Sequence, residues 1–444
     1  MSRLFGTDGI RGTANTDLTC ETALGVGRAA AVEAYKRTGK KPVFLIGSDT
    51  RVSSPMLVSA FAAGLCSAGA DAVTLGCLPT PAVSYLTVKY GADGAAVISA
   101  SHNPARYNGI KLLGADGRKQ SDAVEEATER TYYDKTYAPT RNVGTVKKAK
   151  SPIKDYTDHI RSCVKTDLSG FKIAVDCGNG AAAYTAKRIF APTKAELRIL
   201  NAKTDGAYIN DRCGASDVRR LCEFVRSHGF DCGAAFDGDA DRCILVDEEG
   251  EAFDGDMTLS ALGHDMLCDN KLENRGIVGT VMSNYGFIKF CESSGIKFVC
   301  ADVGDKYVAE LMTSGGYVLG GEQSGHIILP EYMPTGDGQL TALMIFSLMK
   351  KRNAKLSKLS MMEKYPQVLN NVAVKEEKKA LLQTSPLIAA AVKKAEAELC
   401  GGGRVLVRPS GTEPLIRVMA EGSDVEKIKA VVDRLCEIIK KETE

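Results

Sequence analysis

Short apolar runs alternate along most of the chain with longer segments that repeat apolar residues at helical spacing. The runs PVFLIGSD (42–49), DAVTLG (71–76) and GAAVISAS (94–101) are typical of buried strands. The segments between them, SPMLVSAFAAGLCSAG (54–69) and TPAVSYLTVKYG (80–91), have helical periodicity and end at glycine. This strand–helix–strand alternation predicts a mostly parallel sheet with helices on both faces.

The same alternation starts again twice further along the chain. The additional expected strands are FKIAVDC (171–177), LRIL (197–200) and DCGAAFD (231–237), followed by GIVGTV (276–281), KFVCADV (297–303) and GYVLGGE (316–322). Each group with its helices spans about one hundred residues, which fits a separate domain better than part of one very large sheet. Three α/β domains in succession are therefore expected.

The last part of the chain has a different pattern. Three expected strands, NNVAV (370–374), RVLVRPS (404–410) and LIRVMAEG (415–422), are combined with helices over 384–399 and 424–441. This arrangement predicts a smaller α+β domain at the C-terminal end.

Polar or proline-containing segments mark the joins between these domains. The segment 134–155 is basic and contains two prolines, which predicts a linker or a peripheral hairpin. Further breaks fall near 248–256 and at 361–368. The predicted fold class is α/β, with three similar domains built on mixed or parallel sheets and the smaller α+β domain last. The predicted domains cover residues 1–152, 153–254, 255–367 and 368–444.

Composition and charge narrow the class of protein. The 444 residues include 57 Lys and Arg against 55 Asp and Glu, so the net charge of +2 does not suggest a nucleic-acid-binding face. No apolar run approaches the roughly 18–20 residues of a membrane span, and MSRLFGTDGIRG lacks the apolar region of a signal peptide. The 14 cysteines contain no CxxC pair, which favours reduced core thiols. We expect a cytoplasmic protein that binds a small molecule.

The first segment suited to chemistry is SASHNP (99–104), directly after an expected strand. Ligands bind at the carboxyl ends of parallel strands, and the hydroxyl group of Ser101 at such a turn can act as a nucleophile or bind phosphate. A turn in which these residues only reverse the chain is the alternative. A Ser–His hydrolase is disfavoured because no G-x-S-x-G motif is present and His102 directly follows Ser101.

The second such segment, DGDADR (237–242), carries three carboxylates at alternate positions. Asp237, Asp239 and Asp241 can converge on one divalent cation when the loop curls, whereas without a cation their charges repel. An EF-hand is disfavoured because Arg242 stands where that loop needs glycine and because the flanking residues predict strands. We therefore expect a magnesium site, with a solvated acidic turn as the alternative.

Three further polar segments offer weaker signals. GNGAAA (178–183) matches the dinucleotide fingerprint, but Asn201 ends the next strand where an acidic residue is expected, so close helix packing is favoured. GEQSGH (321–326) offers groups suited to sugar hydroxyls, or it is a polar hairpin turn. RPSGTEP (408–414) followed by Arg417 forms a credible phosphate-binding loop, or a hairpin with exposed arginines.

Together these segments resemble the α-D-phosphohexomutase superfamily over nearly the whole chain. The segments that match its five signatures, in order, are FGTDGIRG (5–12), ISASHNP (98–104), FDGDADR (236–242), GEQSGH (321–326) and RPSGTEP (408–414). The resemblance implies four domains around a central cleft and an isomerase that moves a phosphoryl group within a sugar phosphate. It also implies one Mg²⁺ per subunit and a sugar 1,6-bisphosphate as intermediate and activator.

The resemblance assigns roles residue by residue. Ser101 becomes the phosphoserine, and Asp237, Asp239 and Asp241 bind Mg²⁺ together with a phosphoserine oxygen. The other implied catalytic residues are Arg11, Lys111, Arg242 and His326, of which Lys111 and His326 are candidates for proton handling. The implied substrate-binding residues are Glu322 and Ser324 for sugar hydroxyls and Arg408, Ser410, Gly411, Thr412 and Arg417 for the phosphate that is not transferred.

The resemblance also indicates a substrate. GEQSGH, FGTDGIRG and the chain length are most similar to the branch that interconverts glucosamine 6-phosphate and glucosamine 1-phosphate for UDP-N-acetylglucosamine synthesis. Tyr107 before NGIK is closer to relatives that act on glucose or mannose phosphates, which keeps that alternative open. A metal-dependent sugar phosphatase and a phosphosugar-binding sensor are further alternatives. Helical faces of the first domain allow a homodimer.

Overall fold

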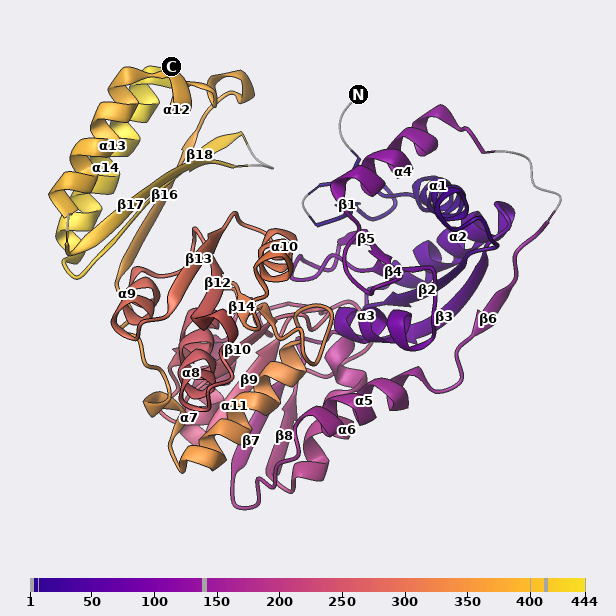
Figure 1. The fold of residues 1–444 in the computed structure, drawn as a ribbon, viewed down its shortest axis with the longest axis horizontal. Helices are drawn as coiled ribbons and strands as arrows, with labels where there is room; N and C mark the ends of the chain where they lie inside the picture. The colour runs from indigo at the N-terminus through magenta and orange to yellow at the C-terminus, as the bar shows by residue number, and fades with distance from the viewer. Residues whose placement is uncertain (1–3, 7, 138–141, 400, 411–413, 444) are drawn as a thin grey trace. The chain divides into compact units, whose positions relative to one another are not determined.

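The structure is a computed structural model that describes residues 4–6, 8–137, 142–399, 401–410 and 414–443 (Figure 1). These residues fall into two compact units. The larger unit combines Met1–Met282 with Ile296–Met361, and the smaller unit combines Ser283–Gly295 with Met362–Glu444. The larger unit contains three sheets in chain order, and the smaller unit contains a fourth.

The first sheet has six strands in the order β1-β5-β4-β2-β3-β6. Strands β4, β2, β3 and β6 are parallel, whereas β5 is antiparallel to both β4 and β1. The sheet is mixed because the loop 99–106 is too short for a parallel crossover, which needs about a dozen residues or more. The elements are β1 (Ile10–Thr13), α1 (Cys20–Thr38), β2 (Val43–Ser48), α2 (Ser54–Ser67), β3 (Asp71–Cys77), α3 (Thr80–Lys89), β4 (Gly94–Ile98), β5 (Tyr107–Gly114), α4 (Asp122–Asp134) and β6 (Val146–Lys148).

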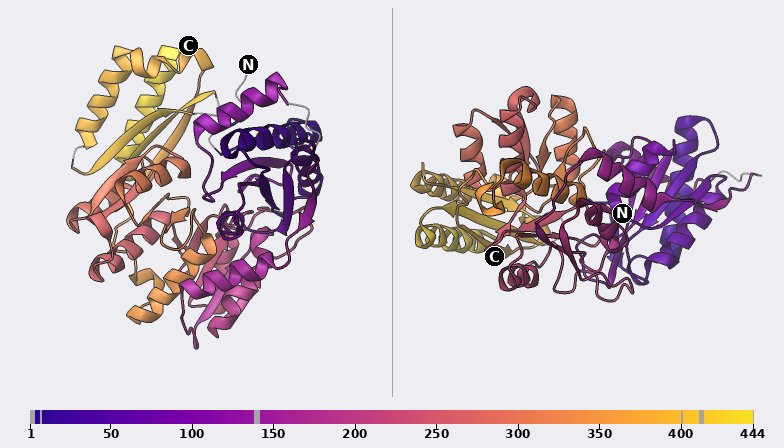
Figure 2. Two further views of the ribbon diagram at one scale, coloured as in Figure 1. Left: turned by 45° about the vertical axis from the view of Figure 1, so that its right-hand side comes forward. Right: turned by 90° about the horizontal axis from the view of Figure 1, so that it is seen from below.

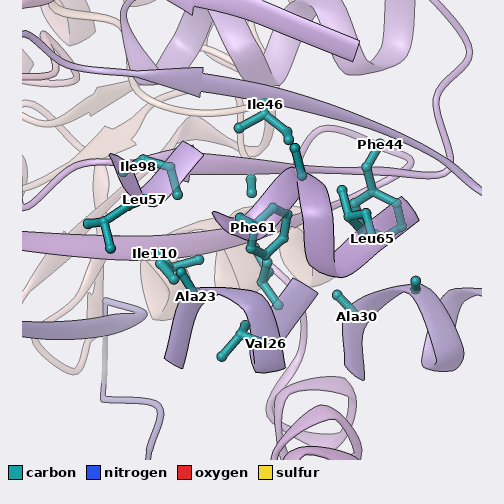
Figure 3. Packing of buried hydrophobic residues seen from close by; sticks show 14 of the residues in the cluster. Ala23, Val26, Ala30, Phe44, Ile46, Leu57, Phe61, Leu65, Ile98 and Ile110 are labelled. Atoms are coloured by element: carbon teal, nitrogen blue, oxygen red, sulfur yellow. The ribbon is translucent and has the colours of Figure 1, made fainter. Parts of the chain in front are cut away.

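Alternate side chains of the first sheet face different helix layers. Phe44 and Ile46 of β2 pack with Phe61 of α2 in one buried apolar cluster, which also takes residues from α1 (Figure 3). On the other face, Gly47 lies directly against Val83 of α3, so that a Cβ at position 47 would lie 2.3 Å from Val83 Cγ2. The two-residue period of a strand thus produces the predicted helix layers on both faces.

The segment 134–155 differs in part from the predicted linker or hairpin. Val146–Lys148 forms β6, an exposed edge strand that pairs in parallel with β3. Two of its three residues are lysines, which protect an edge strand from further pairing. The polar composition therefore reflects an edge strand as well as a connection between domains.

The second sheet has the order β11-β10-β9-β7-β8. Strands β9, β7 and β8 are parallel, and β10 and β11 extend the sheet through antiparallel pairs. Loop 237–242 therefore follows the carboxyl end of β9 directly. The elements are α5 (Pro152–Cys163), β7 (Lys172–Asp176), α6 (Ala186–Phe190), β8 (Glu196–Leu200), α7 (Arg219–His228), β9 (Cys232–Phe236), β10 (Cys243–Val246) and β11 (Ala252–Phe253).

The third sheet has the order β13-β12-β14-β15, with β15 antiparallel to β14. The predicted strand 316–322 is much shorter, because Gly316 ends α10 in the left-handed region and Tyr317 N–H bonds back to Met312 O at 2.9 Å. The elements are α8 (Gly255–Cys268), β12 (Gly276–Thr280), β13 (Lys297–Ala301), α10 (Asp305–Gly315), β14 (Gly320–Gly321), β15 (Ile327–Ile328) and α11 (Gly338–Arg352).

The smaller unit contains the predicted α+β arrangement. Its antiparallel sheet has the order β16-β18-β17, and α13 and α14 pack side by side on one face (Figure 2). Buried Glu421 of β18 accepts hydrogen bonds from Tyr285 N–H (3.0 Å) and Arg404 Nε (2.6 Å), which ties α9 to this sheet. The elements are α9 (Tyr285–Ser293), β16 (Gln367–Ala373), α12 (Leu381–Thr384), α13 (Pro386–Leu399), β17 (Gly403–Pro409), β18 (Leu415–Gly422) and α14 (Val425–Thr443).

Two expectations about the chain as a whole can be compared with the described residues. Every cysteine among them is free, in agreement with the predicted reduced thiols, but Cys268 and Cys300 are exposed and so do not lie in the core as predicted. Within the same residues, no helix is both long enough and apolar enough to cross a membrane.

Short 3₁₀ turns lie at Ala181–Tyr184, Ala191–Thr193, Glu273–Arg275, Leu356–Lys358 and Glu376–Lys378.

Candidate active site

The loop after β4 brings Ser101 to the acidic loop after β9. Ser101 is buried, and its Oγ donates a hydrogen bond to Asp237 Oδ2 at 2.6 Å. His102 Nδ1 lies 3.3 Å from the same Oγ. Burial, together with the charges of Arg242 and Arg11, lowers the pKa of His102 to about 4, so this imidazole is neutral near pH 7.

The three carboxylates of the acidic loop converge, as the sequence predicted. Asp237, Asp239 and Asp241 are all buried, and one ligand atom from each lies within 4.8 Å of the others. Burial, with the charges of Asp241 and Asp239, raises the pKa of Asp237 well above its usual range. Ala240 at φ +55° supplies the sharp turn that curls the loop.

The donor set of this loop fits a divalent cation. Asp239 Oδ1 and Asp241 Oδ1 are buried and have no hydrogen-bond partner within the described part of the chain. Unpaired carboxylate oxygens are costly to bury, and a hard cation with oxygen ligands satisfies them. The loop joins two strands, β9 and β10, rather than two helices, which excludes the EF-hand.

Lys111 is the principal protein cation beside these carboxylates. The middle of β5 places Lys111 Nζ 2.9 Å from Asp239 Oδ2 and 3.6 Å from Asp241 Oδ2, and the side chain is buried. Burial alone would lower the pKa of Lys111, but Asp239, Asp8 and Asp241 raise it. Thr80 Oγ1 also donates to Asp239 Oδ2, at 2.6 Å.

A second charged cluster adjoins the first. Asp8 pairs with Arg11 and Lys119 and lies 3.5 Å from Lys111 Nζ. Burial would raise the pKa of the Asp8 carboxyl, but Lys111, Lys119 and Arg11 lower it well below its usual range. Lys119 Nζ also donates to Asp305 Oδ1 at 2.7 Å. This cluster connects the first domain to the start of α10.

The turn between β14 and β15 supplies the third side of the site. His326 is buried, with Nδ1 3.7 Å from Asp241 Oδ2 and Nε2 3.7 Å from Asp305 Oδ2. Burial would lower the pKa of His326, but the Asp241 and Asp305 carboxylates raise it. Glu322 Oε1 accepts a hydrogen bond from Gly304 N–H at 3.1 Å.

These groups border a cavity of about 180 Å³. Its lining residues are Asp8, Arg11, His102, Lys119, Asp241, Arg242, Val303, Gly304, Asp305, Glu322 and His326. Arg11 Nε, Arg242 Nε and His326 Nε2 are buried donor or acceptor atoms that lack a hydrogen-bond partner among the described residues. A larger cavity of about 490 Å³ shares Lys119 and Asp305, but the buried polar atoms without partners among the described residues make the smaller cavity the better candidate for a polar ligand.

The predicted phosphate-binding residues belong to the smaller unit. Arg408 on β17 and Arg417 on β18 are directly paired across the two strands. Burial and the Arg417 charge lower the pKa of Arg408, so an anion between the two arginines would relieve their repulsion. Ser410 follows β17 and is buried, whereas Gly411 and Thr412 lie outside the described residues.

Sequence analysis missed several residues that the structure brings to the site. Asp8, Asp305 and Thr80 contact the expected residues Arg11, His326 and Asp239. Lys119 joins them through Asp8 and Asp305, and only Asp8 lies in a segment singled out in the sequence. Lys119 and Asp305 are 186 positions apart. Their pairing depends on how the first and third domains pack, which has no local signal in the sequence.

Most of the chain matches the domain models of one protein family. These models are phosphoglucomutase/phosphomannomutase domain I (residues 2–138), domain II (154–250), domain III (254–365) and the C-terminal domain (369–438). The first three are described as alpha/beta/alpha domains. The protein therefore belongs to the phosphoglucomutase/phosphomannomutase family and has its four domains.

Individual relatives and solved structures are similar to this chain over its full length. A phosphoglucosamine mutase from Clostridium acetobutylicum is 46% identical over 446 residues and covers 99% of each chain. A family protein from Burkholderia thailandensis has the same fold, with a TM-score of 0.83, 23% identity and coverage of 99% and 97% of the two chains. An Aspergillus fumigatus N-acetylphosphoglucosamine mutase in complex with GlcNAc-6P and magnesium has a TM-score of 0.68, 16% identity and coverage of 99% and 96%.

Proposed function

We propose that this protein interconverts glucosamine 6-phosphate and glucosamine 1-phosphate through a phosphoserine at Ser101 and a hexosamine 1,6-bisphosphate intermediate. Full-length relatives at about 46% identity carry that activity in their names. The observation that carries the proposal is the contact between Ser101 Oγ and Asp237 inside a buried triad of carboxylates. A serine beside a cation-binding triad is suited to accept and donate a phosphoryl group.

Mg²⁺ is the proposed metal, held by Asp237, Asp239, Asp241 and an oxygen of phosphorylated Ser101. When bound, it neutralises the charge that spreads over the oxygens of the transferring phosphoryl group. Carboxylates that leave an open position suit magnesium, which is usually shared between protein and phosphate oxygens. The unpaired Oδ1 atoms of Asp239 and Asp241 support this assignment.

The protein's own residues bind the substrate and handle its protons. Arg11 and Arg242 line the same cavity as His102, and their buried Nε–H groups, which have no partner among the described residues, can bind phosphoryl oxygens. Lys111 and His326 are the proposed proton-handling groups for the attacking hydroxyl. Glu322 and Ser324 are the proposed partners of sugar hydroxyls, and the buried Oγ of Ser324 has no hydrogen-bond partner in the described ranges.

Two transfers complete one turnover. The phosphoryl group passes from Ser101 Oγ to the free sugar hydroxyl, which loses its proton to a protein base, and the product is the bisphosphate. The bisphosphate turns over, and its other phosphoryl group returns to Ser101 Oγ while the released sugar oxygen takes up a proton. The net change moves one phosphoryl group between two oxygens of the sugar. Arg408, Ser410, Gly411, Thr412 and Arg417 are proposed to bind the phosphate that is not being transferred.

A comparison of kcat/KM on three substrates tests the proposal. Glucosamine 6-phosphate, glucose 1-phosphate and mannose 1-phosphate are each assayed with Mg²⁺ and a catalytic amount of the matching 1,6-bisphosphate. We expect the highest kcat/KM on glucosamine 6-phosphate and activation by the bisphosphate. A preference for glucose or mannose phosphate would contradict the substrate, whereas net release of inorganic phosphate without bisphosphate activation would indicate a phosphatase.

A further inference from the structure

A buried arginine that no sequence motif singled out lies behind the serine loop. Arg51 follows β2 and is 1% exposed. It approaches neither the carboxylate triad nor the substrate cavity with any hydrogen bond among the described residues. Its burial therefore needs a reason, because an arginine is rarely placed inside a protein unless its charge and donors are satisfied.

Every N–H group of the Arg51 guanidinium is used: three of the five bind the loop that carries Ser101, and a fourth binds the first residue of β5. Nη2 donates to the carbonyl oxygens of Ser101 (2.9 Å) and Asn103 (2.7 Å). Nη1 donates to those of Pro104 (2.6 Å) and Tyr107 (2.9 Å). The rigid, planar fork of an arginine can fix four carbonyl groups at once, which a lysine ammonium with three donors cannot do.

The fifth N–H group links this contact to a second support of the same loop. Arg51 Nε donates to Asp49 Oδ2 at 2.8 Å, which neutralises the buried charge. Ser99 Oγ donates to the same carboxylate oxygen at 2.6 Å and accepts the Ser101 N–H at 2.9 Å. Both the N–H and the C=O of Ser101 are therefore held by one buried network.

A residue of the second domain holds the loop from the other side. Asn210 Nδ2 donates to the carbonyl oxygens of Ser101 (2.8 Å) and Asn103 (3.1 Å), the same two groups that Arg51 Nη2 contacts. Gly206 packs against the Thr50–Val52 backbone so closely that a Cβ there would lie 2.1 Å from Thr50 O. The two domains thus share one set of supports for Ser101.

The backbone of Ser101 explains why so many supports are present. Its φ is +50°, in the left-handed region that a serine seldom adopts. Such a conformation is unfavourable for a residue with a side chain and persists where the surroundings over-determine it. In this conformation Ser101 Oγ reaches Asp237 Oδ2 at 2.6 Å.

We propose that Arg51 is a positioning residue for phosphoryl transfer: it clamps the carbonyl groups of residues 101, 103, 104 and 107 so that Ser101 Oγ stays aligned with the Asp237 carboxylate, and Asn210 reinforces the clamp. This inference rests on the proposed phosphoserine role of Ser101. A small misplacement of the nucleophile lowers the transfer rate without changing how the sugar is bound.

Three variants test the clamp with the full-length protein. Arg51→Lys keeps the charge but loses donors, and Asn210→Gly removes the amide at a position whose φ of +58° suits glycine. Leu57→Val is the control. Leu57 is buried on α2, the helix that follows Arg51 in the chain, and its side chain donates no hydrogen bond. The measurements are kcat and KM for glucosamine 6-phosphate with Mg²⁺ and bisphosphate, the phosphate content of Ser101, and the thermal midpoint.

We expect Arg51→Lys to lower kcat at least about tenfold while KM stays within about twofold. Asn210→Gly should lower kcat about threefold or more, again without a rise in KM, and Leu57→Val should lower the thermal midpoint while keeping kcat.

A folded Arg51→Lys protein with wild-type kcat would overturn the clamp. If Arg51→Lys does not fold, Asn210→Gly decides: unchanged kcat overturns the proposal and a lowered kcat supports it. A wild-type protein inactive on every sugar phosphate would instead overturn the proposed function.

Discussion

At the scale of single residues, the site is defined by buried charges that are close to balance but not fully paired. Asp239 takes hydrogen bonds from Lys111 and Thr80 on one oxygen and has none on the other from the described residues. Arg11 and Arg242 each have a buried Nε without a hydrogen-bond partner in the part of the chain that the structure describes. The carboxylate oxygen without a partner can bind a cation, and the arginine N–H groups without a partner can bind an anion. Mg²⁺ and a phosphosugar would together provide both.

Arg417→Ala should raise KM for glucosamine 6-phosphate about 10- to 100-fold with a smaller change in kcat. A charge-assisted hydrogen bond to phosphate contributes about 1.5–3 kcal/mol of binding free energy. Steady-state kinetics measures the two constants. Arg434→Ala is the matched control, because Arg434 forms an exposed ion pair with Glu398 on α13, and its removal should leave KM unchanged. An unchanged KM in Arg417→Ala would place the phosphate site elsewhere.

Residue chemistry could be predicted only where it lies in a compact segment. Ser101 and the three aspartates were identified because each group falls within a few consecutive positions. Asp305 was missed because its relation to His326 and Lys119 exists only after α10 packs beside the first domain. Arg51 was missed because a buried arginine after a strand looks in sequence like any turn residue.

At the scale of secondary-structure elements, helix α11 begins at a buried carboxylate. Asp337 Oδ1 accepts the backbone N–H groups of Gln339 (2.9 Å) and Leu340 (3.0 Å), and Oδ2 accepts the Tyr156 hydroxyl at 2.8 Å. Burial raises the pKa of Asp337 from 3.8 to about 6, although these hydrogen bonds lower it.

Asp337→Asn should remove a pH-dependent loss of stability. Because the pKa of Asp337 is higher in the folded state, the folded protein holds more protons between about pH 4 and 6, so its stability falls as the pH rises through that window. The shift corresponds to about 3 kcal/mol at most. Asparagine is an equally good helix N-cap but does not titrate. Thermal midpoints of both proteins across pH 4–7 check this, and a constant difference between them would contradict it.

The elements themselves were largely predictable from the sequence. Strands β2, β4, β7, β9 and β12 match the apolar runs within a few residues, because each is bounded by glycine or polar residues. The apolar residues of 316–322 predict a strand over the whole run, but its first residues form the C-terminal cap of α10. A capping hydrogen bond competes with strand pairing but does not change the hydrophobic periodicity, so the pattern alone cannot predict it.

At the scale of the whole molecule, the residues proposed for phosphoryl transfer belong to the larger unit, and those proposed to bind the second phosphate belong to the smaller one. The four domains of the family fit this division. The sequence pattern predicts the same number of domains, because it contains three α/β groups of elements followed by an α+β group. The domain boundaries at 152, 254 and 367 stay predictions. The division into two units could not be predicted, because α9 follows β12 in the chain yet bonds to β18 through Glu421.

Removing divalent cations should destabilise the protein. Without a cation, the three buried carboxylates repel one another, so a chelator should lower the thermal midpoint and Mg²⁺ should restore it. Mg²⁺ at 100 times its Kd should stabilise the folded state by about 2.7 kcal/mol. Asp241→Asn is expected to lose this response, because it removes one of the proposed ligands. A midpoint insensitive to chelator and to Mg²⁺ would argue against a metal site.

The central claim is that Ser101 carries the phosphoryl group that reaches the sugar. A single-turnover experiment measures this most directly: protein phosphorylated at Ser101 is mixed with glucosamine 6-phosphate and Mg²⁺, and Ser101 and the sugar phosphates are followed by mass spectrometry. The account predicts that each phosphoryl group lost from Ser101 appears as hexosamine 1,6-bisphosphate, while Ser101→Ala transfers none. Release of inorganic phosphate in place of bisphosphate, or undiminished transfer in Ser101→Ala, would contradict it.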